Sequence, residues 1–311
     1  MDKIICIVGP TASGKTRLSI ALAQALGAEV VSFDSMQLYR GMDIGTAKPT
    51  KEEMQGIPHH MLDFLDPRED YSVSRYVQDA DRCVRDILAR GKPVILVGGT
   101  GLYVDSLILG RQFAPYPETG RREALTRQAQ EQGIETVLAQ LREVDPEAAA
   151  ALHPSNQKRI IRALEVYQET GKTITEHNRL SKLRPPKYNP LWLGLTFSRR
   201  QTLYDRIDRR VEEMLRAGLV DEVRRLVESG VSEKATALQA IGYKELLGML
   251  RGECTLEEAK ASIQLLSRRY AKRQLTWFRR NPDVHWIEAE APWEEIFLTA
   301  RQYVTAFDST F

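Results

Sequence analysis

Residues 9–16, Gly-Pro-Thr-Ala-Ser-Gly-Lys-Thr, have the spacing of a phosphate-binding loop: one glycine, four residues, then Gly-Lys-Thr. An apolar run precedes the loop and a helical pattern follows it, so backbone N–H groups and a helix N-terminus can converge on a phosphate. A lysine adds positive charge, and a threonine hydroxyl can ligate Mg²⁺. The predicted phosphate-binding residues are Gly9, Pro10, Thr11, Ala12, Ser13, Gly14, Lys15 and Thr16, with Thr16 as the metal ligand.

Asp34 is the next residue whose type and place suggest chemistry. It follows a predicted strand over 29–33, at the strand end where open α/β sheets place their ligands. It can be a turn or helix-capping residue, an acid that holds Mg²⁺ in a nucleoside triphosphatase, or a general base facing an acceptor. All three interpretations stay open from the residue alone.

The apolar run 93–97 bears on that choice. In many nucleoside triphosphatases such a strand ends in an acid that positions Mg²⁺, whereas here Gly-Gly-Thr-Gly follows at 98–101. The acid is missing, which makes ATP hydrolysis a poorer interpretation of the loop.

Two basic segments suggest a polyanionic partner. In 268–280 the basic residues fall on one face at 100° per residue, the aromatic residues fall on the other, and no acid interrupts them. In 157–164 a second basic face lies opposite Ile160, Ile161 and Leu164. Two separated basic faces fit a folded RNA. The basic residues concerned are Lys158, Arg159, Arg162, Arg268, Arg269, Lys272, Arg273, Arg279 and Arg280.

Composition limits the class of protein. The chain has 311 residues, 42% hydrophobic and 28% charged, and a net charge of only +2, so the position of the basic residues carries more information than their number. Three distant cysteines without metal spacing predict reduced thiols. Neither a secretory signal nor an apolar run of about 20 residues is evident. We expect a cytoplasmic monomer without a membrane segment or an obligate protein partner.

Alternating strand and helix patterns place these motifs in an α/β fold. Strands are predicted near 4–8, 29–33, 93–99, 191–197 and 284–289, and their continuous apolar runs indicate a parallel sheet with helices on both faces. Between Pro115/Pro117 and the proline-rich 184–190 every segment is helical. We therefore predict a P-loop core over 1–114, an inserted helical subdomain over 115–186, and the rest of the core, with a basic helical region, over 187–311.

Taken together, these motifs make the chain resemble the tRNA dimethylallyltransferases, also called tRNA isopentenyltransferases. The resemblance spans nearly the whole chain. It rests on residues 9–16, SFDSMQLYRGMDIGTAKP at 32–49, VGGTGLY at 97–103, NQKRIIRALEVY at 156–167, AIGYKEL at 240–246 and the basic 268–280, in that family's order. Lys244 stands where many members are expected to carry arginine, which keeps the charge but loses bidentate geometry.

The resemblance implies a reaction and roles for the residues. Dimethylallyl diphosphate would donate its prenyl group, with Mg²⁺, to N6 of the adenosine 3′ of the anticodon, and the tRNA anticodon stem-loop would be gripped with this base extruded. Asp34 would be the base and Thr100 would hold a substrate from the opposite wall. Arg206 would bind the diphosphate, with Arg209 and Arg210 as alternatives. The implied tRNA contacts are Asp34, Ser35, Met36, Gln37, Thr100, Arg122, Gln157, Lys158, Arg159, Ile160, Ile161, Arg162, Gly242, Tyr243, Lys244, Lys272 and Arg273.

Three rival functions remain at this stage. A P-loop kinase of a nucleotide or small metabolite would use Asp34 toward its acceptor and the helical insertion as a lid. A non-catalytic RNA-binding protein would merely retain the loop, although the intact Lys15-Thr16 pair and Asp34 count against it. The same prenyl chemistry could also act on free adenine nucleotides, an acceptor that the long basic C-terminal half disfavours.

Overall fold

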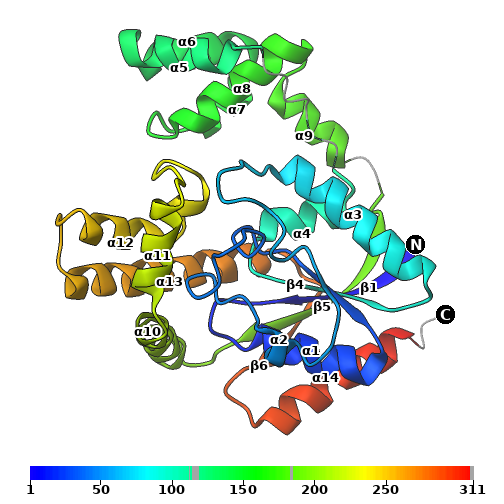
Figure 1. The fold of residues 1–311 in the computed structure, drawn as a ribbon. Helices are drawn as coiled ribbons and strands as arrows, with labels where there is room; N and C mark the ends of the chain where they lie inside the picture. The colour runs from blue at the N-terminus through cyan, green and yellow to red at the C-terminus, as the bar shows by residue number, and fades with distance from the viewer. Residues whose placement is uncertain (112, 114–118, 183–184, 309–311) are drawn as a thin grey trace. The chain divides into compact units, whose positions relative to one another are not determined.

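In the residues that the computed structural model describes (1–111, 113, 119–182 and 185–308), six parallel strands form one sheet of order β3-β2-β4-β1-β5-β6 (Figure 1). Along the central strand, Ile4, Cys6 and Val8 pack on one face and Ile5 and Ile7 on the other. Because both faces are buried, the strand is apolar throughout, as the sequence predicted. The strands are β1 (Asp2–Val8), β2 (Glu29–Ser32), β3 (His59–His60), β4 (Val94–Val97), β5 (Tyr188–Thr196) and β6 (Val284–Glu288).

Helices cover both faces of this sheet, which confirms the predicted α/β fold class. On one face α1 (Lys15–Leu26) and α14 (Trp293–Asp308) pack together, with Leu22 and Val304 in the same core as Ile7. On the other face α3 (Val73–Ala89) and α4 (Gly101–Ile108) bring Tyr76 and Val104 against Cys6. The short α2 (Lys51–Met54) lies in the long connection between β2 and β3. No helix in the described part of the chain has the length and apolarity to cross a membrane.

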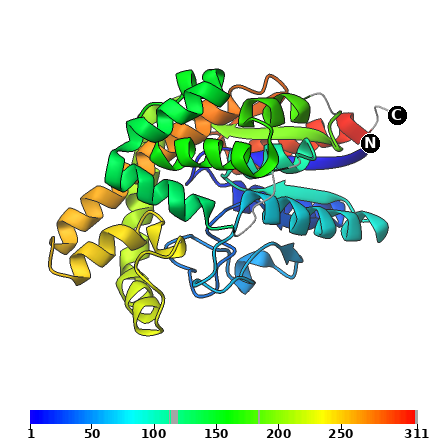
Figure 2. The same cartoon turned by 90° about the horizontal axis from the view of Figure 1, so that it is seen from above.

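A second group of helices lies at the carboxyl end of the strands. Both ribbon views place α12 at the opposite end of this part of the fold from the start of β1 (Figures 1 and 2). Their side chains reach the loops that leave the sheet, since Arg210 contacts Thr11 and Gln274 contacts Gly99. The group comprises α10 (Arg200–Arg216), α11 (Leu219–Glu228), the 3₁₀ turn η1 (Ala237–Gln239), α12 (Tyr243–Leu250) and α13 (Leu256–Phe278).

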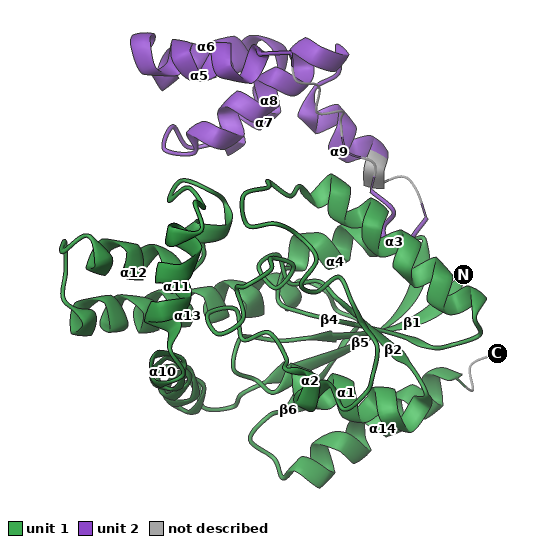
Figure 3. Ribbon diagram, in the orientation of Figure 1, with its two compact units in different colours: residues 1–108, 187–311 green, residues 109–186 purple. Residues whose placement is uncertain are grey.

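The chain divides into two compact units, residues 1–108 with 187–311, and residues 109–186 (Figure 3). The second unit is all-helical and has its own core, in which Leu125, Leu141 and Ile160 meet. Its helices are α5 (Arg121–Gln132), α6 (Ile134–Val144), α7 (Pro146–Ala151), α8 (Gln157–Thr170) and α9 (Ile174–Lys182). The joint expected at Pro115 and Pro117 lies outside the described residues, as does Arg184 of the second joint.

The parallel arrangement brings four connections to one edge of the sheet. The loop after β1, the segment after β2, the turn after β4 and the entry to α10 after β5 all follow carboxyl ends of strands. The predicted strand 93–99 ends at Val97 because its glycines form the turn into α4. The sequence motifs therefore meet at the edge where open α/β folds bind ligands.

Candidate active site

The loop of residues 9–14 has the backbone geometry of a phosphate cradle. Gly14 adopts φ +93° immediately before α1, and Gly9 has φ +145°. A Cβ at Gly9 would lie 2.8 Å from the Leu195 carbonyl oxygen, so β5 passes too close for any larger residue. These two glycines direct the loop over the N-terminus of α1, whose N–H groups and dipole favour an anion.

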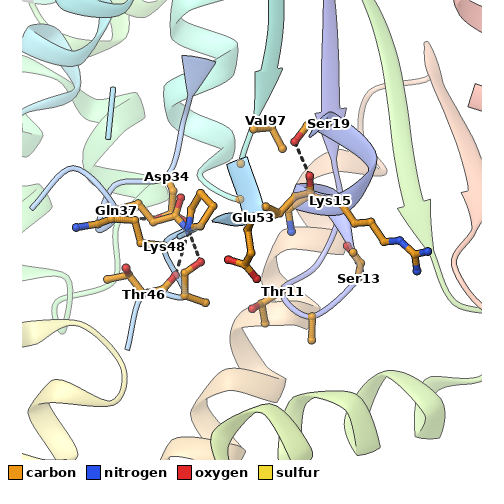
Figure 4. A pocket seen from close by; sticks show the side chains of 18 of the residues that line it. Thr11, Ser13, Lys15, Ser19, Asp34, Gln37, Thr46, Lys48, Glu53 and Val97 are labelled. Atoms are coloured by element: carbon orange, nitrogen blue, oxygen red, sulfur yellow. Dashed lines mark hydrogen bonds between the residues drawn. The ribbon is translucent and has the colours of Figure 1, made fainter. Parts of the chain in front are cut away.

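Lys15 lies in this cradle with its charge poorly compensated (Figure 4). Its Nζ donates to the Pro10 carbonyl at 2.7 Å. Burial of the ammonium, and secondly repulsion from Arg210, lower the pKa of Lys15 to about 7, while Asp34 opposes that shift. Two cations held close together in a partly desolvated site favour binding of an anion, which would relieve both effects.

Arg210, rather than Arg206, contacts the loop. All three arginines 206, 209 and 210 line the same cavity. The Arg210 Nη1 donates to Thr11 Oγ1 at 3.3 Å, and burial lowers the pKa of this guanidinium. Arg206 lies one turn earlier on α10, with its guanidinium 5.2 Å from the centre of the Phe197 ring. Arg209 is exposed. Arg206 and Arg210 are one helical turn apart, so the periodicity of α10 cannot show which of them contacts the phosphate loop. The packing of α10 against the loop places Arg210 at Thr11.

Asp34 is both a turn residue and a cavity residue. Its Oδ1 accepts the backbone N–H groups of Met36 at 2.9 Å and Gln37 at 3.4 Å. Thr100 reaches the same segment from the turn after β4, accepting the Ser35 backbone N–H on Oγ1 at 3.1 Å. The turn fixes the carboxylate through one oxygen and leaves Oδ2 as the atom suited to take a proton.

Gln37, one of the implied tRNA contacts, also holds a loop of the protein. Its Nε2 donates to the carbonyls of both Thr46 and Ala47 at 3.1 Å, so both amide hydrogens are engaged within the protein. Ser35 and Met36 do line a cavity beside Asp34. The amide of Gln37 therefore anchors the following loop, and its contact with tRNA stays a prediction.

Two cavities meet at Asp34. The larger, about 1140 Å³, is walled by the phosphate loop and α10, and the smaller, about 290 Å³, has both apolar and polar side chains of α10 and α13 in its wall. Ile207, Val211 and Ile263 supply apolar surface to the smaller one. The residues that line both are Thr11, Asp34, Thr46, Arg210, Met214 and Tyr270. An anion site and a smaller space with a mixed polar and apolar lining thus share one carboxylate at their boundary.

The glycines after β4 accommodate α13. A Cβ at Gly99 would come 2.0 Å from Gln274 Nε2, and one at Gly101 would come 2.3 Å from the Trp277 indole. Tyr270, Gln274 and Trp277 form the inward stripe of α13 at this turn. Sequence analysis overlooked Gln274, although its position four residues after Tyr270 and three before Trp277 marks a polar residue on an inward face.

The outer face of α13 presents basic residues, with one exception. Arg269, Lys272 and Arg273 are exposed, and Arg273 also lines the smaller cavity. Arg268 is instead half-buried, donating to Asp208 at 2.6 Å. Arg268 is therefore not equivalent to Arg269, Lys272 and Arg273, because Asp208 of α10 pairs with it and residues 268–280 contain no acid of their own.

In the helical unit, α8 separates its basic and apolar sides as predicted. Lys158 and Arg159 are exposed, whereas Ile160 is fully buried and Ile161 nearly so, in the core of that unit. These isoleucine side chains are therefore excluded as surface contacts, contrary to the expectation. The buried Glu165 carboxylate accepts hydrogen bonds from Arg122 at 2.7 Å and Arg162 at 2.8 Å, and Gln157 is exposed at the helix start.

The segment 242–244 has a similar division. The Tyr243 side chain is fully buried and its hydroxyl donates to Glu222 at 2.6 Å, so any contact of this residue with RNA would be made by its backbone. The Glu222 carboxylate also accepts the backbone N–H groups of residues 43–45 at 2.8–3.1 Å. Gly242 lines the smaller cavity and Lys244 is exposed. Tyr243 and Glu222 thus hold the loop that completes the cavity wall.

The residues present fit a metal that arrives with a phosphate ligand. Within the described ranges no group of three or more His, Cys, Asp or Glu could hold an ion. Mg²⁺ usually keeps several waters and binds through one or two protein oxygens together with substrate phosphates. Thr16 and Asp34 both line the larger cavity and offer such oxygens beside the phosphate loop.

The family model, the similar sequences and the similar structures all point to the same protein family. Residues 37–281 match the family model described as IPP transferase. A tRNA dimethylallyltransferase of Caldanaerobacter subterraneus is 48% identical over 92% of this chain and 91% of its own. The tRNA isopentenylpyrophosphate transferase structure from Bacillus halodurans superposes with a TM-score of 0.75 at 42% identity, covering 98% and 96% of the chains. A eukaryotic dimethylallyltransferase described as acting on tRNA gives 0.84 at 31% identity, over 99% of this chain and 79% of that one.

Proposed function

The chain belongs to the IPP transferase family, and from this membership we propose that it transfers the dimethylallyl group of dimethylallyl diphosphate to N6 of the adenosine on the 3′ side of the tRNA anticodon. The observation that carries the proposal is the meeting of two cavities at Asp34. A transfer between two substrates needs the reacting atoms about 3–3.5 Å apart. One cavity suits the diphosphate of a donor and the other an acceptor base.

The donor half uses the phosphate loop to stabilise a leaving group. The C–O bond between the prenyl carbon and the diphosphate breaks, and the diphosphate departs with the electron pair. Lys15, the loop amides and Arg210 neutralise the developing charge, which is the main requirement for ionising an allylic diphosphate. Mg²⁺ held by Thr16 and the diphosphate oxygens would supply further neutralisation.

The acceptor half needs a base, because the N6 lone pair is delocalised into the adenine ring. As the new N6–C bond forms, one N6 proton passes to the Asp34 carboxylate through Oδ2, since Oδ1 is bonded to the backbone of the turn. Thr100 keeps the Asp34–Ser35 segment in place through the Ser35 amide. Ser35 and Met36 then form the wall against which the base lies.

Recognition of the RNA would come from exposed basic side chains on both units. Specific RNA recognition favours unstacked loop bases, and an extruded base suits the smaller cavity. Arg273 and Gly242 lie at that cavity, so they are the candidates nearest the flipped nucleotide. The exposed candidates for the anticodon stem-loop backbone are Gln157, Lys158, Arg159, Lys244 and Lys272, whereas Arg122 and Arg162 are partly buried and bonded to Glu165.

The test is incubation with dimethylallyl diphosphate, Mg²⁺ and bulk tRNA, followed by mass analysis of the nucleosides. We expect N6-isopentenyladenosine and release of one diphosphate per prenyl group, without any ATP. A kinase would instead require ATP and yield ADP. Absence of prenylated nucleoside, with ATP consumed in the presence of a small acceptor, would overturn the proposal in favour of that rival.

A further inference from the structure

Gln274 is a buried polar residue at the centre of the site. Its side chain, on α13, is 4% exposed and lies between two connections that leave different strands. The Thr11 backbone N–H of the phosphate loop donates to Gln274 Oε1 at 2.8 Å, and Gln274 Nε2 donates to the Gly99 carbonyl at 3.1 Å. One amide therefore joins the loop after β1 to the turn after β4.

This contact completes a hydrogen-bonded path to the carboxylate. Thr100 follows Gly99 directly, accepts the Ser35 backbone N–H at 3.1 Å and donates to Ser35 Oγ at 3.3 Å. Ser35 in turn follows Asp34. The path therefore runs from the phosphate loop through Gln274, the Gly99–Thr100 turn and Ser35 to Asp34.

The packing at Gly99 shows that the Gln274 amide lies directly against the turn after β4. A Cβ there would lie 2.0 Å from Gln274 Nε2, so the turn can approach the amide only as glycine. Tyr270, one helical turn earlier, reaches the same carbonyl with its hydroxyl at 3.4 Å. An amide supplies one acceptor and one donor at once, which is what the Thr11 N–H and the Gly99 carbonyl require.

We propose that Gln274 is a positioning residue, which sets the separation between the diphosphate on the loop and the acceptor held at Asp34 and Thr100. This role rests on the proposed function. It acts through the two connections, not on substrate. Without the bridge each substrate still has its own cavity, but the reacting atoms lose their alignment. A misplacement of about 1 Å can cost roughly 100-fold in rate.

The experiment compares Gln274→Met with Gln264→Met. Methionine has a similar volume but neither makes nor accepts a strong hydrogen bond. Gln264 lies on the same helix, outside both cavities, and its Nε2 donates to the Asp208 carbonyl at 3.4 Å. At saturating tRNA and dimethylallyl diphosphate we expect Q274M to transfer the prenyl group about 10- to 100-fold more slowly, with its tRNA Kd within about threefold of wild type, and Q264M to match wild type.

The rate is divided by the fraction of the protein that still binds tRNA. If Gln274 only stabilised the fold, Q274M would lower this fraction, and the molecules that still bind tRNA would transfer the prenyl group at the wild-type rate. A Q274M rate within twofold of wild type overturns the role, and so does an equal loss in Q264M. If Q274M does not fold, Gly99→Ala is measured in its place, because the added Cβ forces the Gln274 amide away from the turn. A folded G99A protein with slow prenyl transfer supports the bridge, and a folded G99A protein with full activity overturns it. No transfer by wild type would instead overturn the proposed function itself.

Discussion

Replacement of Arg210 by methionine tests which arginine of α10 holds the leaving group. Arg210 donates to Thr11 of the phosphate loop at 3.3 Å and repels Lys15, whereas Arg206 lies against the Phe197 ring. A hydrogen bond to a charged group contributes about 1.5–3 kcal/mol, equivalent to about 10- to 150-fold in affinity. We expect R210M to weaken dimethylallyl diphosphate binding by that factor and R206M to weaken it less.

The assay is the Kd of the diphosphate donor with Mg²⁺, by calorimetry, alongside the tRNA Kd. Arg216→Met, on the same helix but outside both cavities, controls for loss of a positive charge. Because Arg210 also lowers the pKa of Lys15, R210M should raise that pKa and extend lysine protonation to higher pH. A loss in R206M equal to or greater than that in R210M would refute the assignment.

Three further outcomes are expected. Asp34→Asn keeps an Oδ1 acceptor for the turn but cannot take a proton, so single-turnover prenyl transfer should fall by about 10²- to 10⁴-fold at an unchanged tRNA Kd; full activity would remove Asp34 from the mechanism. Burial holds the pKa of Lys15 at about 7, so its ammonium is present below that pH and is lost above it. Donor affinity should therefore fall from about pH 6 to about pH 8, less so in Lys15→Arg, and identical profiles for the two proteins would contradict this. Arg159→Ala and Lys272→Ala should each flatten the dependence of log Kd for tRNA on log salt by about 0.7–0.9 while leaving donor affinity unchanged; unaltered slopes would show that these side chains do not contact RNA phosphates.

The sequence predicted the chemistry of a residue correctly where that chemistry depends on consecutive residues of one short segment. The spacing of residues 9–16, the strand before Asp34 and the missing acid after Val97 are properties of consecutive residues, and the structure has the loop, strand and turn there. The helix at Val73–Ala89 is local in the same sense, because its apolar period and the glycine two residues after its end lie within one segment.

The sequence was least informative where a side chain's partner is distant in the chain. Nothing within α10 distinguishes Arg206 from Arg210, because the choice depends on how α10 docks on the phosphate loop. Gln37 carries the polar groups expected of a base reader, yet the loop that folds back to it uses both its donors. The partner of the Tyr243 hydroxyl is the buried Glu222, which lies on another helix, 21 residues earlier in the chain.

The sequence by itself determined the kind of chemistry: an anion cradle, a carboxylate at a strand end, and two basic helices, because these follow from residue type and spacing. Only the tertiary structure decided which atoms meet. Parallel strand order brings the ends of β1, β2 and β4 together, and α13 then seats on glycines that leave room for Gln274. Contacts of this kind join residues more than 170 positions apart, and no periodicity within either segment records them.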